Sequence, residues 1–257
     1  MNIMQYDRTI WLASGLLLAL MAIGGCRTSD TPPASLQDEA NRARAIDNAS
    51  EGANIIYVFS SGERGADDQP LTMGDAESLR RNCPALDAVA PIIRPRLLVS
   101  YGAGASTVTM VYGTVPEYLK VRSWEKLAAG MSFSQQDVDN SASVCLVGQT
   151  PAEELFKDES PIGRTVTMAG KSFHVIGLLA RRGANSLGYD VDDVILVPIT
   201  SLPDLEQTHK MYLTAKAKSA VDVIEGIRQI EAVLREQHHL GPADPADFSV
   251  HSRAAGN

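Results

Sequence analysis

The sequence predicts an α+β protein: a split βαβ layer, with helices packed on an antiparallel sheet, interrupted by an inserted β-rich region. Three observations lead to this prediction. Strands and one capped helix alternate in the N-terminal part, and a long amphipathic helix lies between two strands near the C-terminus. Between these parts, glycine and proline punctuate a series of short strands.

The N-terminal part opens with residues 54–60, whose β-branched and aromatic side chains predict a strand. Thr72 and Asp75 form an N-cap pair, so we expect a helix directly after Thr72. Further strands are expected at residues 92–101 and 107–112, the second with clear alternation of polar and apolar side chains. This order of strand, helix and strand makes the first βαβ-like unit.

The C-terminal part has the same order. Residues 211–216 predict a strand, residues 219–236 a long helix and residues 248–251 a final strand. Apolar side chains recur along the helix with the spacing of a face that packs on a sheet. This stripe consists of Val223, Ile224, Ile227, Ile230 and Leu234.

The middle region, residues 113–198, combines short apolar runs with many glycines and prolines. Strands are expected at residues 143–148, 164–168, 171–179 and 194–197, and one short helix at residues 151–156. The region therefore reads as a β-rich subdomain inserted into the split layer.

Length and composition limit the classes of function. The chain has 257 residues, of which 44% are hydrophobic, and a net charge of −8. This is enough apolar material for one large domain or two small ones, and it argues against a disordered chain. The negative charge, without clustered Lys and Arg, argues against nucleic acid as a partner.

Residues 1–25 have the features of a signal peptide or a short membrane anchor. Arg8 precedes an uncharged, largely apolar stretch at residues 9–25, which ends in Ile23-Gly24-Gly25 directly before Cys26. This ending resembles a bacterial lipobox, so Cys26 is the candidate lipidation site. A stretch of about 17 residues is at the lower limit for a spanning helix, so an uncleaved anchor and a buried core helix are the alternatives. All but the core helix place the rest of the chain outside the cytoplasm.

Residues 26–51 are expected to form a tether and stalk. Residues 27–35 are polar and contain two prolines, as in a linker. Residues 36–49 are rich in Ala, Arg, Asp and Glu and have a thin apolar face, which indicates a solvated helix. The globular part is expected over residues 52–252.

With Cys26 set aside, Cys83 and Cys145 remain, an even number of cysteines in an oxidising compartment. A disulfide between them would close a loop of about 60 residues and add roughly 3–4 kcal/mol of stability through chain entropy. The alternative is two buried free thiols, because residues 144–147 have the pattern of a core strand. We predict the disulfide and keep the free thiols as the alternative.

The acidic cluster Asp190, Asp192 and Asp193 is the candidate metal site, because closely spaced carboxylates offer oxygen ligands to a hard cation. The cluster lacks the glycine and the terminal glutamate of a calcium-binding loop. One alternative is a structural loop whose aspartates cap turns and accept hydrogen bonds from backbone amides. A second alternative is contact with a partner. The structural loop is our expectation, so no metal is predicted.

The other motifs supply neither catalytic residues nor a cofactor site. Residues 169–172, Ala-Gly-Lys-Ser, resemble the end of a phosphate-binding loop, but Thr165 stands where that motif requires a glycine. The five histidines lack the His-Glu-x-x-His spacing of a zinc site. The sequence contains no Gly-x-Ser-x-Gly elbow with a nucleophilic serine.

The globular part resembles the periplasmic core domain of MacB-type ABC transporter permeases. The resemblance rests on residues 111–124, on Gly130-x-x-Phe133-Ser134-x-x-Asp137, on residues 144–150 and on Gly188-Tyr189-Asp190 with Asp192-Asp193. The opening residues 52–58 and the closing residues 234–250 fit too. The similarity therefore covers most of the globular part in one register.

This resemblance implies a non-catalytic extracytoplasmic domain with two parts. A porter-like part would comprise residues 52–112 and 199–252, and an inserted, β-rich, sabre-like part residues 113–198. In such permeases the domain couples ATP hydrolysis in the cytoplasm to the movement of a substrate or a partner protein outside. The resemblance thus implies protein partners of an ABC-type export system, a location on the periplasmic side of the cell envelope and no cofactor.

The sequence also departs from these permeases, because no second long apolar stretch follows Pro198 and no ATPase module is present. Three hypotheses follow. The first, which we expect, is a membrane-tethered module that makes protein–protein contacts in an efflux or export system. It would be attached through a lipid on Cys26 or through the N-terminal helix. The others are a truncated permease fragment and a periplasmic enzyme, for which we find no catalytic residues.

Overall fold

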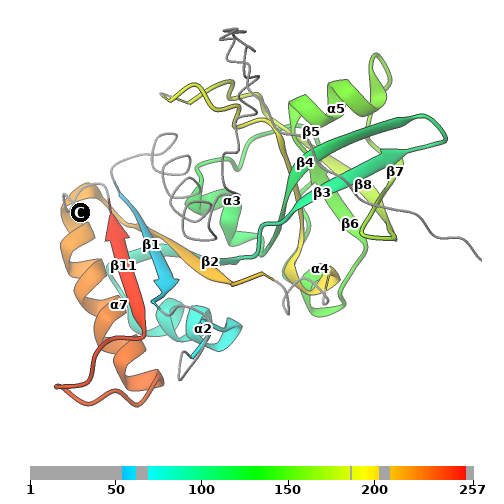
Figure 1. Ribbon diagram of the computed structural model, residues 1–257. Helices are drawn as coiled ribbons and strands as arrows, with labels where there is room; N and C mark the ends of the chain where they lie inside the picture. Colours follow the sequence, from blue (N-terminus) through cyan, green and yellow to red (C-terminus); the bar gives the residue numbers. More distant parts are fainter. Residues whose placement is uncertain (1–53, 62–68, 186, 203–208, 253–257) are drawn as a thin grey trace, which may run out of the picture.

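Two β-sheets, each assembled from distant parts of the chain, form the framework of the protein (Figure 1). The computed structural model describes residues 54–61, 69–185, 187–202 and 209–252. Helices and strands both contribute to this framework, so the predicted α+β class is confirmed. The predicted signal peptide or anchor, the tether and Cys26 lie outside the described residues.

The first sheet has four antiparallel strands. In spatial order they are β11 (Phe248–Ser252), β1 (Ile55–Ser60), β10 (Tyr212–Ala217) and β2 (Leu86–Ile92). Helix α2 (Met73–Asn82) connects β1 to β2, and helix α7 (Val223–Gln237) connects β10 to β11. Each helix joins two strands that have a third strand between them, which is the predicted split βαβ arrangement.

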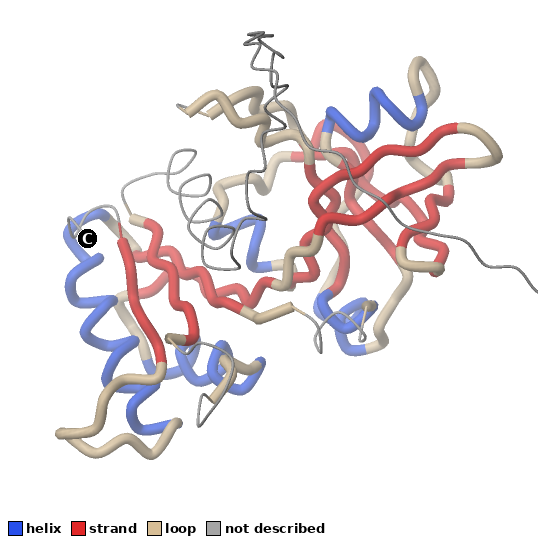
Figure 2. The backbone as a smooth tube through the Cα atoms, in the orientation of Figure 1, coloured by secondary structure: helices blue, strands red, loops and turns tan. Residues whose placement is uncertain are grey.

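Helices α2 and α7 cover one face of this sheet, as Figure 2 shows. The predicted N-cap pair forms a complete capping box. The Asp75 N–H donates to Thr72 Oγ1 at 3.2 Å, and the Thr72 N–H donates to Asp75 Oδ2 at 2.8 Å. Gly226 allows α7 to approach the sheet closely, because a Cβ at this position would lie 3.1 Å from side-chain atoms of Ile56 and Leu86.

The predicted apolar stripe of α7 is wrong at one position. Val223, Ile230 and Leu234 are buried against the sheet and Ile227 is partly buried, whereas Ile224 is 73% exposed. Successive helical residues are about 100° apart around the axis. Ile224 therefore points away from the sheet that its neighbour Val223 contacts.

The second sheet is a closed barrel. Its order is β5-β8-β6-β9-β4-β3-β7. Because β7 also pairs with β8, the six strands from β8 to β7 close into a ring. Strand β5 pairs with the C-terminal end of β8. The strands are β3 (Arg96–Tyr101), β4 (Ala105–Thr114), β5 (Leu127–Gly130), β6 (Val144–Val147), β7 (Thr165–Met168), β8 (Lys171–Leu179) and β9 (Val194–Pro198).

Short helices accompany the barrel. They are α3 (Glu117–Val121), α4 (Gln135–Asp139), α5 (Gln149–Phe156) and a 3₁₀ turn at Ile199–Ser201. Leu155 and Phe156 of α5 pack with inward-facing strand residues such as Val99, Phe173 and Ile195. The barrel is therefore filled by side chains and has its own apolar core.

The change from one sheet to the other differs from the sequence-based boundary. The strand expected at residues 92–101 starts later, because β3 begins in the barrel at Arg96, and the strand β2, which ends in the first sheet at Ile92, was not expected. Pro95 lies between them and has no N–H to donate to a strand ladder. Strands β3 and β4 consequently belong to the barrel, whereas the sequence assigned residues 52–112 to the first part.

A search of the described ranges finds no helix with the length and apolar character needed to cross a membrane.

Candidate functional site

The junction between the two sheets is a feature that the fold builds from distant segments. We use "the junction" for α3, residues 122–124 and the crossing at Ile93 and Gly113. Helix α3 follows β4 of the barrel but packs on the face of the first sheet opposite α2 and α7 (Figure 1). One apolar cluster therefore contains residues of both sheets. From the first sheet it includes Ile55, Tyr57, Ala90 and Ile92, and from the junction and the barrel Tyr118, Leu119, Trp124, Leu146 and Leu196.

Polar contacts fix α3 in this position. Lys120 Nζ lies 2.8 Å from Asp87 Oδ1, in β2. Lys216 Nζ, from β10, donates to the Lys120 carbonyl at 3.2 Å and to Ser123 Oγ at 2.8 Å. On the barrel side, Trp124 Nε1 donates to the Ala180 carbonyl at 2.8 Å. The short helix is thus bonded to the first sheet and, through the next three residues, to the barrel.

The two sheets also meet directly where the chain crosses between them. The Ile93 N–H donates to the Gly113 carbonyl at 3.0 Å, and the Gly113 N–H donates to the Ile93 carbonyl at 2.8 Å. Thr114 Oγ1 donates to the Pro91 carbonyl at 2.8 Å and is buried. A Cβ at Gly113 would lie 3.4 Å from Ile199 Cα, which is van der Waals contact, so the 3₁₀ turn packs directly on this strand.

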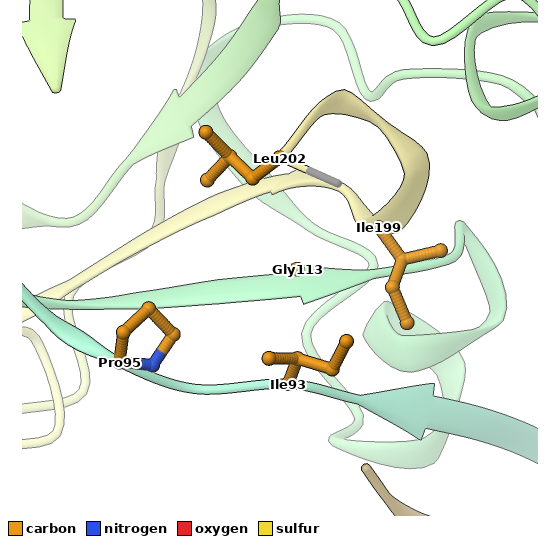
Figure 3. A pocket seen from close by; sticks show the side chains of 5 residues that line it. All are labelled: Ile93, Pro95, Gly113, Ile199 and Leu202. Atoms are coloured by element: carbon orange, nitrogen blue, oxygen red, sulfur yellow. The ribbon is translucent and has the colours of Figure 1, made fainter. Parts of the chain in front are cut away.

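A small apolar depression lies beside this crossing (Figure 3). It is lined by Ile93, Pro95, Gly113, Ile199 and Leu202, and it leaves no room for a water molecule. None of these residues carries an ionisable or nucleophilic side chain. The depression is therefore a packing feature of the junction and offers no site for chemistry.

The acidic cluster is held by protein donors. Asp192 is buried, and its carboxylate accepts the N–H groups of Arg182 and Gly183, both at 2.8 Å. The Asp192 N–H donates to Asp190 Oδ1 at 2.8 Å, and Thr150 Oγ1 donates to Asp190 Oδ2 at 2.6 Å. These contacts are those of the structural loop that we expected from the sequence.

Asp193 lies next to this loop and faces the barrel. Arg96 Nη2 donates to its Oδ2 at 3.1 Å. Burial raises the pKa of the Asp193 carboxyl above its ordinary value, although the nearby Arg96 guanidinium opposes the effect. Within the described part of the chain, no three His, Cys, Asp or Glu side chains are grouped so that they could hold a metal ion.

The prediction of a disulfide between Cys83 and Cys145 is wrong. Cys83 and Cys145 are both buried and free. Cys83 packs under the first sheet, whereas Cys145 lies inside the barrel, so the two thiols belong to different apolar clusters. Burial raises the pKa of the Cys83 thiol to about 11 and that of Cys145 further still. The structure therefore agrees with the alternative given in the sequence analysis, in which both thiols are free, buried and protonated.

One polar cluster was not predicted from the sequence. His238, at the end of α7, is buried between two carboxylates: its Nδ1 lies 2.8 Å from Asp247 Oδ2, and its Nε2 lies 3.5 Å from Asp75 Oδ1. Phe248 packs edge-on against the imidazole ring. The cluster ties α2, α7 and β11 together. Asp75 is far from His238 and Asp247 in the sequence, so the spacing of the three residues gives no signal.

Comparison with known proteins gives the same fold. The profile of the MacB-like periplasmic core domain matches residues 39–233. The macrolide export ATP-binding/permease protein MacB of Syntrophobacter fumaroxidans is 34% identical over 235 residues, which cover 70% of this chain and 33% of that protein. The pyoverdine export ATP-binding/permease protein PvdT of Pseudomonas aeruginosa is 26% identical over 189 residues, 73% of this chain and 28% of that protein. The chain thus spans about a third of the length of these curated relatives.

Two solved structures resemble the fold. The periplasmic region of MacB from Actinobacillus actinomycetemcomitans has a TM-score of 0.64 at 21% identity, covering 80% of this chain and 92% of that chain. The extracellular domain of the noncanonic ABC-type transporter YknZ from Gram-positive bacteria has a TM-score of 0.62 at 19% identity, covering 77% of this chain and all of that chain. At such identities the likeness concerns the fold alone.

Proposed function

Because the chain belongs to the MacB-like periplasmic core domain family, we propose that it is a non-catalytic module, tethered to a membrane on the periplasmic side of the cell envelope, that contacts protein partners of an ABC-type export or efflux system. Its relatives are export ATP-binding/permease proteins, which supplies the transport context. The tether and the contacts with partners are the parts that we add.

The junction is the observation that best supports this proposal. Helix α3 binds the first sheet through Lys120 and its apolar face, and Trp124 binds the barrel. A body whose two parts share one apolar cluster can transmit a displacement from one part to the other, because packed interiors deform little. This property suits a module that relays movement between partners.

We assign the porter-like part to the four-stranded sheet with α2 and α7, and the sabre-like part to the closed barrel. The crossings then lie between Ile92 and Arg96 and between Pro198 and Tyr212. This replaces the sequence-based boundary within β4. The assignment rests on which strands hydrogen-bond to one another.

For the tether, we propose acylation of Cys26. Metabolic labelling with an alkynyl palmitate should mark the wild-type chain and leave Cys26→Ala unlabelled, whereas Cys83→Ala, a buried-thiol control, should keep the label. An unlabelled wild-type chain that stays in the membrane fraction would replace the lipid by an uncleaved N-terminal helix. A wild-type chain found only in the soluble fraction would contradict any tether.

The proposed contacts are tested by photo-crosslinking in the cells that make the protein. A photoreactive amino acid would replace Leu98 or Val108, an exposed pair that faces across β3 and β4 on the outside of the barrel. We expect adducts with subunits of an ABC-type export system, identified by mass spectrometry. Adducts restricted to unrelated envelope proteins, or no adduct from either position, would contradict the proposal.

A permease fragment is the second candidate, because the chain spans about a third of its curated relatives. It requires that the DNA downstream encode further apolar spans. Their absence would exclude this candidate.

A further inference from the structure

We infer that the end of the first sheet at which the chain enters from the proposed tether rests on the lipid surface, with Val221 and Ile224 as the contact. We call this end the entry end: Asn54, the last residues of β10 and β11, the 3₁₀ turn Ala220–Asp222 and the first turn of α7. The inference rests on the proposed function, because it requires a chain attached to a membrane through residues before Asn54.

Strand register brings these segments together. Ile55 pairs with Lys216 near the end of β10, and Ile56 pairs with Ser252 at the end of β11. Asn54 exchanges backbone and side-chain hydrogen bonds with Ala217, both of 2.9 Å. Figure 1 shows the start of α7 beside the tail of β1 and the head of β11. The first described residue after the tether therefore lies next to the turn that precedes α7.

This end carries the two most exposed large apolar side chains of the described structure. Val221 is 86% exposed and Ile224 is 73% exposed. They are three residues apart across the first turn of α7, so they point in similar directions. The other strongly exposed apolar side chains, such as Leu98 and Met131, belong to the barrel part. Exposed apolar side chains at one site mark a contact surface more often than scattered ones do.

The charges around this pair balance one another, so they do not oppose contact with a lipid surface. Lys218 and Arg228 are exposed beside it, and Arg228 forms an ion pair with Glu225. The acidic groups of the same region accept hydrogen bonds: Glu225 from Arg228 at 2.6 Å, and Asp222 from Ser219 Oγ at 2.5 Å. A small apolar patch whose surrounding charges are balanced can enter the interfacial region of a membrane.

Two apolar side chains bind a bilayer weakly by themselves. Attachment to the bilayer, however, raises the effective concentration of a linked group at the membrane surface. Residues 27–53 separate Cys26 from Asn54, so a lipid on Cys26 would hold the entry end near the bilayer. The weak contact would then orient the module, with the barrel directed away from the lipid.

The test uses the full acylated chain in vesicles of phosphatidylethanolamine and phosphatidylglycerol. Val221→Cys is labelled with an environment-sensitive dye, since the native Cys83 and Cys145 thiols are buried. A matched control carries the dye at Val108→Cys, an exposed position of the barrel. A shallow lipid-borne quencher should reduce the emission at position 221 roughly twofold more than at position 108. Adding Ile224→Asp to the labelled Val221→Cys chain should remove this difference.

Three results would overturn the inference. Equal quenching at positions 221 and 108 would mean that the entry end does not select the lipid. If the emission of the dye at position 221 changes in native membranes but not on protein-free vesicles, a protein covers the pair. An unchanged signal after Ile224→Asp would exclude the pair as the contact. In all three cases the chain still floats with the vesicles, whereas a chain that does not float contradicts the tether of the proposed function.

Discussion

At the scale of single residues, Gly148 shows why the acidic loop and α5 need each other. Its N–H donates to the Val194 carbonyl at 2.8 Å, directly after β6 and before the first turn of α5. A Cβ at this position would lie 2.2 Å from the Asp192 carbonyl oxygen and 2.8 Å from that of Val194. The backbone that carries Asp192 therefore lies where any other side chain would be.

We predict that Gly148→Ala lowers the free energy of unfolding by about 1–3 kcal/mol, because the loop must move away from α5 to accommodate the methyl group. The matched control is Gly104→Ala, since a Cβ at Gly104 meets no atom within 4 Å. Urea unfolding followed by circular dichroism measures both. Equal stability of the two variants would contradict the close approach.

Cys83 makes the stability depend on pH on the alkaline side. Burial raises the pKa of its thiol from the ordinary 9.0 to about 11, so the folded protein keeps a proton that the unfolded chain releases. The contribution of Cys83 to stability is therefore complete below pH 9.0 and is lost as the pH rises toward about 11. Urea unfolding on both sides of pH 9.0 should show a smaller alkaline loss for Cys83→Ala than for the wild type. An unchanged loss would mean that Cys83 does not cause it.

At the scale of elements, the capping box of α2 has a second role. Asp75 accepts from Thr72 and also faces Nε2 of His238, which in turn contacts Asp247. The start of α2, the end of α7 and the approach to β11 are thereby linked through one carboxylate. This linkage explains how a ten-residue helix is held firmly on the sheet.

Thr72→Ala should destabilise the protein by about 1 kcal/mol, the usual cost of a lost N-cap hydroxyl. Thr72→Ser is the matched control and should retain most of the stability, because its hydroxyl can accept the same N–H of Asp75. Thermal unfolding at one protein concentration provides the comparison. A serine variant as weak as the alanine variant would show that packing of the threonine methyl group, and not capping, matters here.

Elements with a local pattern could be predicted from the sequence, whereas elements positioned by tertiary contacts could not. The helix at residues 219–236 and the strand at residues 171–179 have enough turns or alternations for their period to be recognised. Helix α3 has five residues, and its partners are side chains of β2 and β10, so its position depends on tertiary contacts. The junction was therefore missed, although the family resemblance included residues 111–124.

The candidate site residues show the same difference between local patterns and tertiary contacts. A role for Asp192 in binding backbone amides could be proposed because aspartates in turns do so locally. Whether Cys83 and Cys145 meet depends on which core each strand or helix end enters, and cysteine spacing carries no such information. His238 was missed for this reason too, since Asp75 and Asp247 reach it from other elements.

At the scale of the whole molecule, the junction decides whether the two sheets behave as one body. The apolar cluster around α3 contains buried residues of both sheets, and Leu119 lies within it. The barrel also has a separate interior, which includes Leu155 of α5. Truncating a leucine in each place distinguishes coupling between the parts from stability of one part.

We expect the wild-type chain to unfold in a single transition, and Leu119→Ala to lose about 2–5 kcal/mol. Because the four-stranded sheet can then open without the barrel, the amides of β1 and β10 should exchange hydrogen faster than those of β6 and β9. Leu155→Ala should lower the stability similarly but keep one transition, since the junction is intact. Hydrogen exchange read by mass spectrometry separates these outcomes. Two transitions in the wild type, or equal exchange of both sheets in Leu119→Ala, would mean that the junction does not couple the parts.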